Sequence, residues 1–430
     1  MESSTPPHFD ANPTKYDPPA VVPTPDAVPP DAVQKIDRKK LGLYLMAGIY
    51  IASVVLYFAT GGKTPILPPP NIDGAAEPPP QYAMGWVDDR PARAASLARL
   101  PAVDFATTPA GRAALAADKQ ESFLWRAVRK AAGRKEADDW YCNINQRDVG
   151  CCVGAGWKHG ADVCAAVQVI NGKAEEFHPL SAETIYGLSR VDIGGGQIRG
   201  DGSLGSWARE AVAKFGVARM RKFDSVDLTE FSPARAREYG TRGVPADVKT
   251  EAKAHPIKAT ALVSSWADVQ RSIMQGYPVA VCSNVGFADP DGQSPGTRDK
   301  DGFCAARATW PHCMCLIGVR DGNRPGAFCL NSWGDTAHRG PVWPADAPKA
   351  GFWIDANTVD RMVRQGDSYA LAELEGFPAR QLDWFFGAAP PLNDPFAFLA
   401  GQKHPDKDVG FCSAIGKETA KKLGLLTTTR

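Results

Sequence analysis

The chain has 430 residues, enough for one large domain with appendages or for two ordinary domains. Its 49 Lys and Arg balance 48 Asp and Glu, and a net charge of +1 gives no reason to expect nucleic acid or an acidic surface as a partner. An apolar fraction of 44% is ample for a packed core, and 10 cysteines are too few for a disulfide scaffold.

The N-terminal region predicts a tail followed by a membrane span. Residues 1–34 are rich in Pro, with Asp and Thr, and bury too little apolar surface to offset chain entropy. Residues 41–59 contain no charged side chain. A helix of that length spans roughly 28 Å, close to the hydrocarbon thickness of a bilayer. We therefore expect a disordered tail at 1–40 and a single transmembrane helix at 41–60, which would contact the lipid bilayer.

The basic residues around this run predict its orientation. Lys35, Arg38, Lys39 and Lys40 precede it, whereas residues 61–80 contain Lys63 as their only basic residue. The positive-inside rule then places the N-terminus in the cytoplasm and everything after residue 60 outside. A buried core helix fits less well because Pro-rich segments flank the run. A cleaved signal peptide fits less well because 40 residues precede it.

The rest of the chain divides into three parts. Residues 61–137 combine a Pro-rich linker with a helical segment at 108–132, whose apolar face would contain Leu115, Phe123, Leu124, Ala127 and Val128. That segment could be a stalk, an accessory helix or an inhibitory pro-segment. Residues 138–385 alternate helical and strand-like runs and form the main globular domain. Residues 386–430 follow a Pro-rich break and form a peripheral tail.

Cys152 is the first candidate for chemistry. It begins a predicted helix that runs to about Val169. Unpaired N–H groups and the positive end of the helix dipole would favour its thiolate form and make the sulfur nucleophilic. The amide of Gln146, in the preceding loop, could donate a hydrogen bond to an oxyanion formed beside that sulfur. A cysteine at a helix start is often only a small core residue. The interpretation of Cys152 as a nucleophile therefore also requires a side chain that can act as its base.

His312 is the best candidate for that base. His159 lies seven residues beyond Cys152 on the same helix, about 10 Å along its axis and out of reach of the sulfur. Residues 310–319 and 327–331 instead predict two paired strands, and a turn at Asp321 and Gly322 would place His312 opposite Asn331. Pro325 suggests a longer turn that shifts this register by up to three residues. An amide beside the imidazole would fix its tautomer and plane.

The order Gln-x-x-x-Gly-x-Cys, then His, then Asn-Ser-Trp-Gly, resembles the papain family of cysteine peptidases over about residues 140–380. The resemblance implies a two-lobed α+β fold, with a helical lobe that begins at the Cys152 helix and a β-barrel-like lobe that carries the base. The implied roles are nucleophile for Cys152, base for His312, orienting amide for Asn331, oxyanion-hole donor for Gln146, shield for Trp333, and substrate-cleft lining for Gly202 and Ser203.

Several residues depart from the family pattern. Val149 replaces a cysteine that usually forms a disulfide, and Val153 replaces an aromatic residue. Cys151 stands where a small residue is usual, and Ser203 replaces the second glycine of the cleft. No stretch matches the family's usual helical pro-segment. These departures remove no catalytic group and indicate a divergent, membrane-anchored branch.

The resemblance implies a cysteine-type endopeptidase that hydrolyses peptide or protein substrates through a thioester acyl-enzyme, with no metal and no organic cofactor. Two alternatives remain: a Cys/His cell-wall amidase or endopeptidase, and a catalytically inactive papain fold that binds peptides. The other cysteines are expected to be core thiols or disulfide partners. Structural zinc at His312, Cys313 and Cys315 is disfavoured because their spacing is unusual for zinc ligands.

Overall fold

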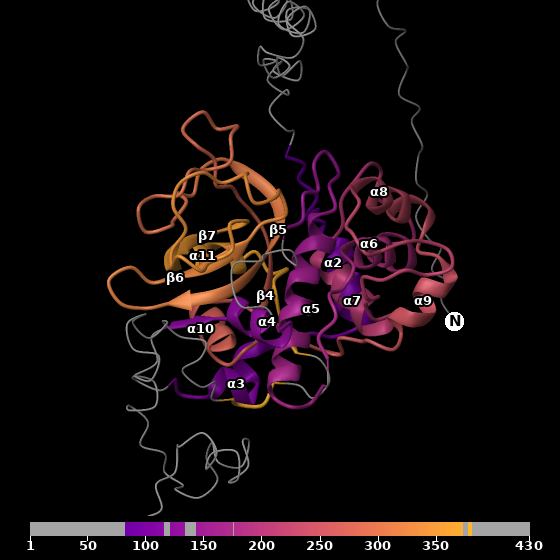
Figure 1. Cartoon of the computed structure of the whole chain (residues 1–430), viewed down its shortest axis with the longest axis horizontal. Helices are drawn as coiled ribbons and strands as arrows, with labels where there is room; N and C mark the ends of the chain where they lie inside the picture. Colours follow the sequence, from indigo (N-terminus) through magenta and orange to yellow (C-terminus); the bar gives the residue numbers. More distant parts are fainter. Residues whose placement is uncertain (1–81, 116–120, 134–142, 175, 373–376, 381–430) are drawn as a thin grey trace, which may run out of the picture. The chain divides into compact units, whose positions relative to one another are not determined.

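The computed structural model describes residues 82–115, 121–133, 143–174, 176–372 and 377–380 (Figure 1). The expected tail at 1–40, the expected transmembrane helix at 41–60 and the expected C-terminal tail at 386–430 lie outside these residues. Among the described helices, none combines the length and apolar character that a membrane span requires.

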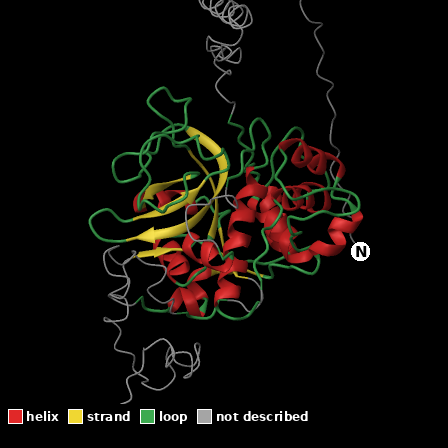
Figure 2. Ribbon diagram, in the orientation of Figure 1, coloured by secondary structure: helices red, strands yellow, loops and turns green. Residues whose placement is uncertain are grey.

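The helices α2, α6, α7, α8 and α9 lie on one side of the described unit, and most of the strands lie on the other together with α10 and α11, with α5 between the two sides (Figures 1 and 2). The helical elements, in chain order, are α2 (Arg90–Arg99), the 3-10 turn η2 (Phe105–Thr107), α3 (Pro109–Arg112), α4 (Trp125–Ala131), α5 (Cys152–Ile170), α6 (Ala182–Gly187), the π-helix η3 (Leu188–Ile193), α7 (Gly205–Lys214), α8 (Pro233–Arg242), α9 (Ala246–Ala252), α10 (Trp266–Met274) and α11 (Ala356–Val363).

The strands form one 8-stranded sheet in the order β1-β3-β8-β4-β5-β6-β7, with β2 paired to β5 off this path. Only β1 and β3 pair in parallel. The predicted mixed α+β class is confirmed. The strands are β1 (Val103–Asp104), β2 (Glu121–Phe123), β3 (Ala259–Leu262), β4 (Val279–Val285), β5 (Thr309–Arg320), β6 (Gly326–Leu330), β7 (Gly351–Asp355) and β8 (Tyr369–Ala372).

The helix that begins at Cys152 is the buried axis of the unit. Of its 19 residues only Ala165, Val169 and Ile170 are not fully buried, as expected of a helix with apolar residues on almost every face. It lies close to β5 because Gly156 has no side chain: an added Cβ there would lie 2.8 Å from the Cys313 sulfur. The start of α5 is therefore held against the strand that carries His312.

The predicted helix at residues 108–132 is wrong over part of its length. Glu121–Phe123 forms β2, which pairs antiparallel with β5, and only the short helices α3 and α4 flank it. The rings of Phe123 and Trp125 are buried and stack with centroids 4.8 Å apart, inside the same core cluster as Leu316 of β5. This packing favours an accessory part of the main domain over a separate stalk.

The hairpin formed by β5 and β6 has the longer turn that Pro325 suggested, and its register is shifted within the expected three residues. Cys315 pairs with Leu330, two residues away from the register that would place His312 opposite Asn331, and an irregularity between Leu316 and Gly318 adds a further shift. The backbone partner of His312 is instead Ser283 of β4. The turn around Pro325 is longer than a two-residue hairpin loop, which accounts for the displacement.

Candidate active site

Cys152 is fully buried at the first position of α5. Cys151 occupies the N-cap position, and its side chain makes no capping hydrogen bond to the first N–H groups of the helix. The backbone N–H of Cys313 donates to the Cys152 sulfur over 3.4 Å, and the backbone N–H groups of Cys313, Gly85 and Val153 act to lower its pKa. Burial nevertheless raises the pKa of the Cys152 thiol, so the described form holds a neutral thiol.

The two adjacent thiols lie in different surroundings. Cys152 packs in a cluster with Trp86 and Cys313, where it meets the strand that carries His312. Cys151 packs in another cluster with Val149 and Tyr186. Burial raises the pKa of both thiols, so it is the packing that distinguishes them.

The side chains of His312 and Asn331 meet although their backbones do not pair. His312 Nε2 lies 2.8 Å from Asn331 Oδ1, and the indole of Trp333 lies over the imidazole with ring centroids 4.7 Å apart. His312 Nδ1 is buried and has no hydrogen-bond partner. Burial lowers the pKa of His312 to about 4, so the imidazole is neutral.

Two consecutive residues of β5 provide the imidazole and the backbone N–H that bonds to the sulfur. His312 carries the ring, and the next residue, Cys313, donates its backbone N–H to Cys152. The structure therefore brings Cys152, His312, Asn331 and Trp333 together. His159 is buried farther along α5, seven residues beyond Cys152.

Residues 82–87, which we call the cover segment, lie across this site. Gly85 O accepts from Ser203 N over 2.8 Å, and Val87 N donates to Ser203 O over 2.9 Å. The N–H groups of Gly85 and Trp86 both donate to Pro311 O, at 3.2 and 3.0 Å. The segment thus bonds to the loop before α7 and to the strand that carries His312, and its Trp86 packs in the same cluster as Cys152.

Two residues expected to line the cleft do contact the cover segment. Ser203 forms the isolated parallel bridge with Trp86, and its hydroxyl lies 2.9 Å from that of Ser189. Gly202 has φ +118°, and an added Cβ would lie 2.9 Å from the Val87 side chain. A glycine is needed there both for its backbone conformation and for the close approach of the segment.

Gln146 is fully buried, and its amide group is fully bonded in this form. Its Nε2 donates to Ala83 O over 2.8 Å and to Val149 O over 2.9 Å, and its Oε1 accepts from the Ser332 hydroxyl. An oxyanion could take the place of Ala83 O only after the cover segment leaves. The expected role of Gln146 in an oxyanion hole therefore stays a prediction.

Asp367 is a site residue that the sequence gave no reason to select. Its buried carboxylate accepts from the backbone N–H groups of Gly205 and Ser206, both at 2.8 Å, and thereby caps α7 from a distant part of the chain. It also accepts from the indole Nε1 of Trp86 at 2.9 Å. Burial raises the pKa of Asp367 to about 6. The side chain of Trp86 is thus buried with its indole N–H bonded to an equally buried acceptor.

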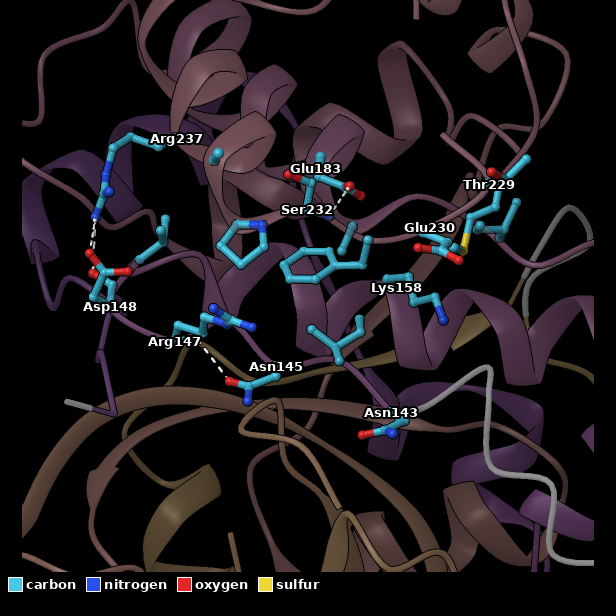
Figure 3. A pocket seen from close by; sticks show the side chains of 18 residues that line it. Asn143, Asn145, Arg147, Asp148, Lys158, Glu183, Thr229, Glu230, Ser232 and Arg237 are labelled. Carbon is cyan, nitrogen blue, oxygen red and sulfur yellow. Dashed lines mark hydrogen bonds and ion pairs between the residues drawn. The ribbon is translucent and has the colours of Figure 1, made fainter. Parts of the chain in front are cut away.

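A cavity with a volume of about 750 Å³ lies under the loop at residues 143–149, bounded by α8 and by the start of α6. In Figure 3 the Arg237–Asp148 pair marks one side of it, and Glu183, bonded to Ser232, lies across from the loop. Its lining includes neither Cys152 nor His312, which is consistent with a cleft filled by the cover segment.

The described cysteines are all free and buried: Cys151, Cys152, Cys164, Cys282, Cys304, Cys313, Cys315 and Cys329. Cys142 and Cys412 lie outside the described residues. No group of three or more potential metal ligands occurs within the part of the chain that the structure describes.

Comparison with known proteins finds no matching family model and no matching curated relative. Solved structures of cysteine proteases do match. Xylellain from Xylella fastidiosa is 15% identical over 70% of this chain and 99% of its own, with a TM-score of 0.45. The ragweed allergen Amb a 11, in its proform, is 14% identical over 76% and 86%, with a TM-score of 0.43. The stem bromelain precursor is 16% identical over 80% and 95%, with a TM-score of 0.41. At these values the likeness assigns neither residue roles nor an activity to this chain.

Proposed function

We propose that this chain is a papain-like cysteine peptidase with Cys152 as nucleophile, His312 as base and Asn331 as the residue that orients the base. One observation carries the proposal: His312 Nε2 is bonded to Asn331 Oδ1 at 2.8 Å, while its Nδ1 is buried without a partner on the strand that contacts the sulfur. A neutral imidazole held in this way can accept a proton only at Nδ1.

The reaction would be acyl transfer to sulfur. The thiol proton of Cys152 moves to His312 Nδ1, and the sulfur attacks the peptide carbonyl carbon. Gln146 Nε2 and a backbone N–H at the start of α5 hold the oxyanion. The imidazolium then protonates the leaving amine as the C–N bond breaks and a thioester forms. His312 next takes a proton from water, whose oxygen attacks the thioester and releases the acid and the thiol.

The described form would be a latent state of this peptidase. The cover segment fills the cleft, occupies the amide of Gln146 and keeps water from Cys152 and His312, which favours their neutral forms. Displacement of residues 82–87 would expose the thiol and allow it to ionise.

The pocket that holds Trp86 suggests a substrate side chain. Asp367 offers an acceptor at its base, and withdrawal of Trp86 would leave that buried carboxylate without one of its donors. A substrate with an N–H donor at the end of a long side chain (Trp, Arg or Lys) would restore the bond. We therefore expect peptides with such a residue at this subsite to be preferred.

Hydrolysis of a mixed fluorogenic peptide library by the purified chain tests the proposal, with Cys152→Ser as the control. We expect cleavage by the wild-type protein and almost none by the variant. Cleavage of muropeptides alone would favour the cell-wall amidase alternative. Saturable peptide binding without cleavage, in protein whose cover segment has been displaced, would favour an inactive binding module.

We also propose that the peptidase lies outside the cytoplasm and is anchored by residues 41–59. This location rests on the uncharged run and on the preceding basic cluster. Protease added to intact cells should digest the chain beyond residue 60. Digestion of residues 1–34 with protection of the remainder would reverse the orientation.

A further inference from the structure

The hydrogen bonds of Asn331 continue to a second buried histidine. His338, in the loop between β6 and β7, is 2% exposed. Its Nε2 lies 3.0 Å from Asn331 Nδ2, and its Nδ1 lies 2.9 Å from the carbonyl oxygen of Gly296. Its ring lies 4.4 Å from that of Phe352 and is nearly parallel to the indole of Trp333. Packing on the ring and hydrogen bonds at both nitrogens hold this imidazole in one orientation.

The donors and acceptors in this chain of bonds are fixed by their chemistry. The Gly296 carbonyl can only accept, so His338 Nδ1 carries the hydrogen, and the neutral ring then offers only a lone pair at Nε2. That lone pair requires the NH2 group of Asn331 on its side and places Oδ1 toward His312. The backbone N–H of Ser332 donates to the same Oδ1 at 2.7 Å and agrees with this orientation.

The orientation of Asn331 in turn fixes the tautomer of His312. An Oδ1 that can only accept requires the hydrogen of His312 to be on Nε2, which leaves the lone pair on Nδ1. We propose that His338 is a positioning residue that acts through Asn331 to keep His312 in the tautomer able to take a proton from Cys152. This inference rests on the proposed peptidase function.

The surroundings of His338 keep its ring neutral, as this role requires. A proton on Nε2 would face the NH2 group of Asn331, donor against donor. Burial, together with the nearby Arg298 and His312, lowers the pKa of His338 to about 4, although the Gly296 carbonyl and Asp289 act in the opposite direction. The thiol of Cys304, 3.9 Å from Nδ1, is the other polar group at the ring.

Two amide variants separate this role from simple packing. In His338→Gln the side-chain oxygen can reach the position of Nε2 and accept from Asn331, whereas in His338→Asn the shorter side chain can reach Gly296 only. We expect His338→Gln to keep most of the wild-type kcat. His338→Asn should lower kcat about 5- to 150-fold with little change in KM, because it leaves a buried N–H without an acceptor.

A double-mutant cycle with Asn331→Ala tests whether the effect passes through Asn331. If it does, His338→Asn should reduce kcat no further in the Asn331→Ala background. Imidazole 15N chemical shifts of His312, recorded in the Cys152→Ser protein, report its tautomer without any need for activity. We expect the Nε2–H form in the parent protein and in His338→Gln, and a mixture of tautomers in His338→Asn.

Equal losses in His338→Gln and His338→Asn, additive effects with Asn331→Ala, or an unchanged His312 tautomer in folded His338→Asn would each overturn the inference. A tautomer change without peptide cleavage in any variant, the parent included, would support the positioning by His338 and count against the proposed function.

Discussion

Gly85→Ala should activate the peptidase, because the cover segment fits over Cys152 only without a side chain at that position. A Cβ added to Gly85 would lie 1.9 Å from Gly150 O and 2.4 Å from Gly150 C. Gly150 cannot easily yield, since it directly precedes the N-cap residue of α5 and its N–H is bonded to Asp201. The clash is therefore relieved by lifting residues 82–87 out of the cleft.

Overpacking of this kind costs about 1–3 kcal/mol. At about 1.4 kcal/mol for each factor of ten, the ratio of open to closed cleft should rise about 5- to 150-fold. The assay is the initial rate of fluorogenic peptide hydrolysis by wild-type and Gly85→Ala protein at equal concentration, with Gly85→Ala/Cys152→Ser as the blank.

Gly111→Ala is a matched control. Its added Cβ would also lie 1.9 Å from a backbone oxygen, that of Phe105, but in α3 and outside the cleft. It should lower the melting temperature without raising activity. A folded Gly85→Ala protein that hydrolyses peptide no faster than wild type, or a Gly111→Ala protein activated to the same degree, would refute the account of the cover segment.

Three further results are expected. His312→Ala should reduce kcat by about 10²- to 10⁴-fold while His159→Ala retains most activity, since only His312 adjoins the residue whose backbone N–H bonds to the sulfur, and equal losses would contradict this. Asp367→Asn should weaken the preference for Arg, Lys or Trp at the Trp86 subsite, measured by kcat/KM on matched peptides; an unchanged preference would exclude that role. The pKa of His338 is lowered from 6.5 to about 4, so its contribution to stability is full above pH 6.5 and declines as the pH falls toward 4. The difference in unfolding free energy between wild type and His338→Gln should shrink over that window, and a constant difference in urea titrations would count against a buried neutral ring.

Local patterns in the sequence predicted several elements closely. The apolar run after Cys152 predicted a helix to about Val169, and α5 ends at Ile170. The two strand-like runs around the turn at Gly322 became β5 and β6. These elements could be predicted from the sequence because each is long and its residue pattern agrees with its tertiary position.

The strand at residues 121–123 was not predicted, and the register of the hairpin was predicted only to within three residues. Pro325 indicated the longer turn, whereas the β-irregularity beside Ile317 depends on backbone geometry that no periodicity encodes. Three residues of β2 are too few to separate a strand from a helix by apolar spacing. The side chains of His312 and Asn331 meet although their backbones are not partners.

The cover segment, Asp367 and His338 carried no local signal. Gly85 contacts residues of the Gln146 loop, the Ser203 loop and β5, and Trp86 reaches Asp367 across 281 positions of sequence. Such contacts follow from the tertiary fold alone. The Asn-Ser-Trp-Gly motif indicated one end of the hydrogen-bond chain of Asn331, whereas its other end, His338, lies seven residues farther on in an irregular loop.

Mapping the residue modified by an epoxysuccinyl cysteine-peptidase inhibitor tests the central claim most directly. The protein is Gly85→Ala, in which the cleft should be open, and the labelled peptide is identified by mass spectrometry. We expect one label per chain, on Cys152, with labelling retained in Cys151→Ser and abolished in Cys152→Ser. A label on Cys151, or Cys152→Ser protein that still hydrolyses peptide, would contradict the assignment of the nucleophile.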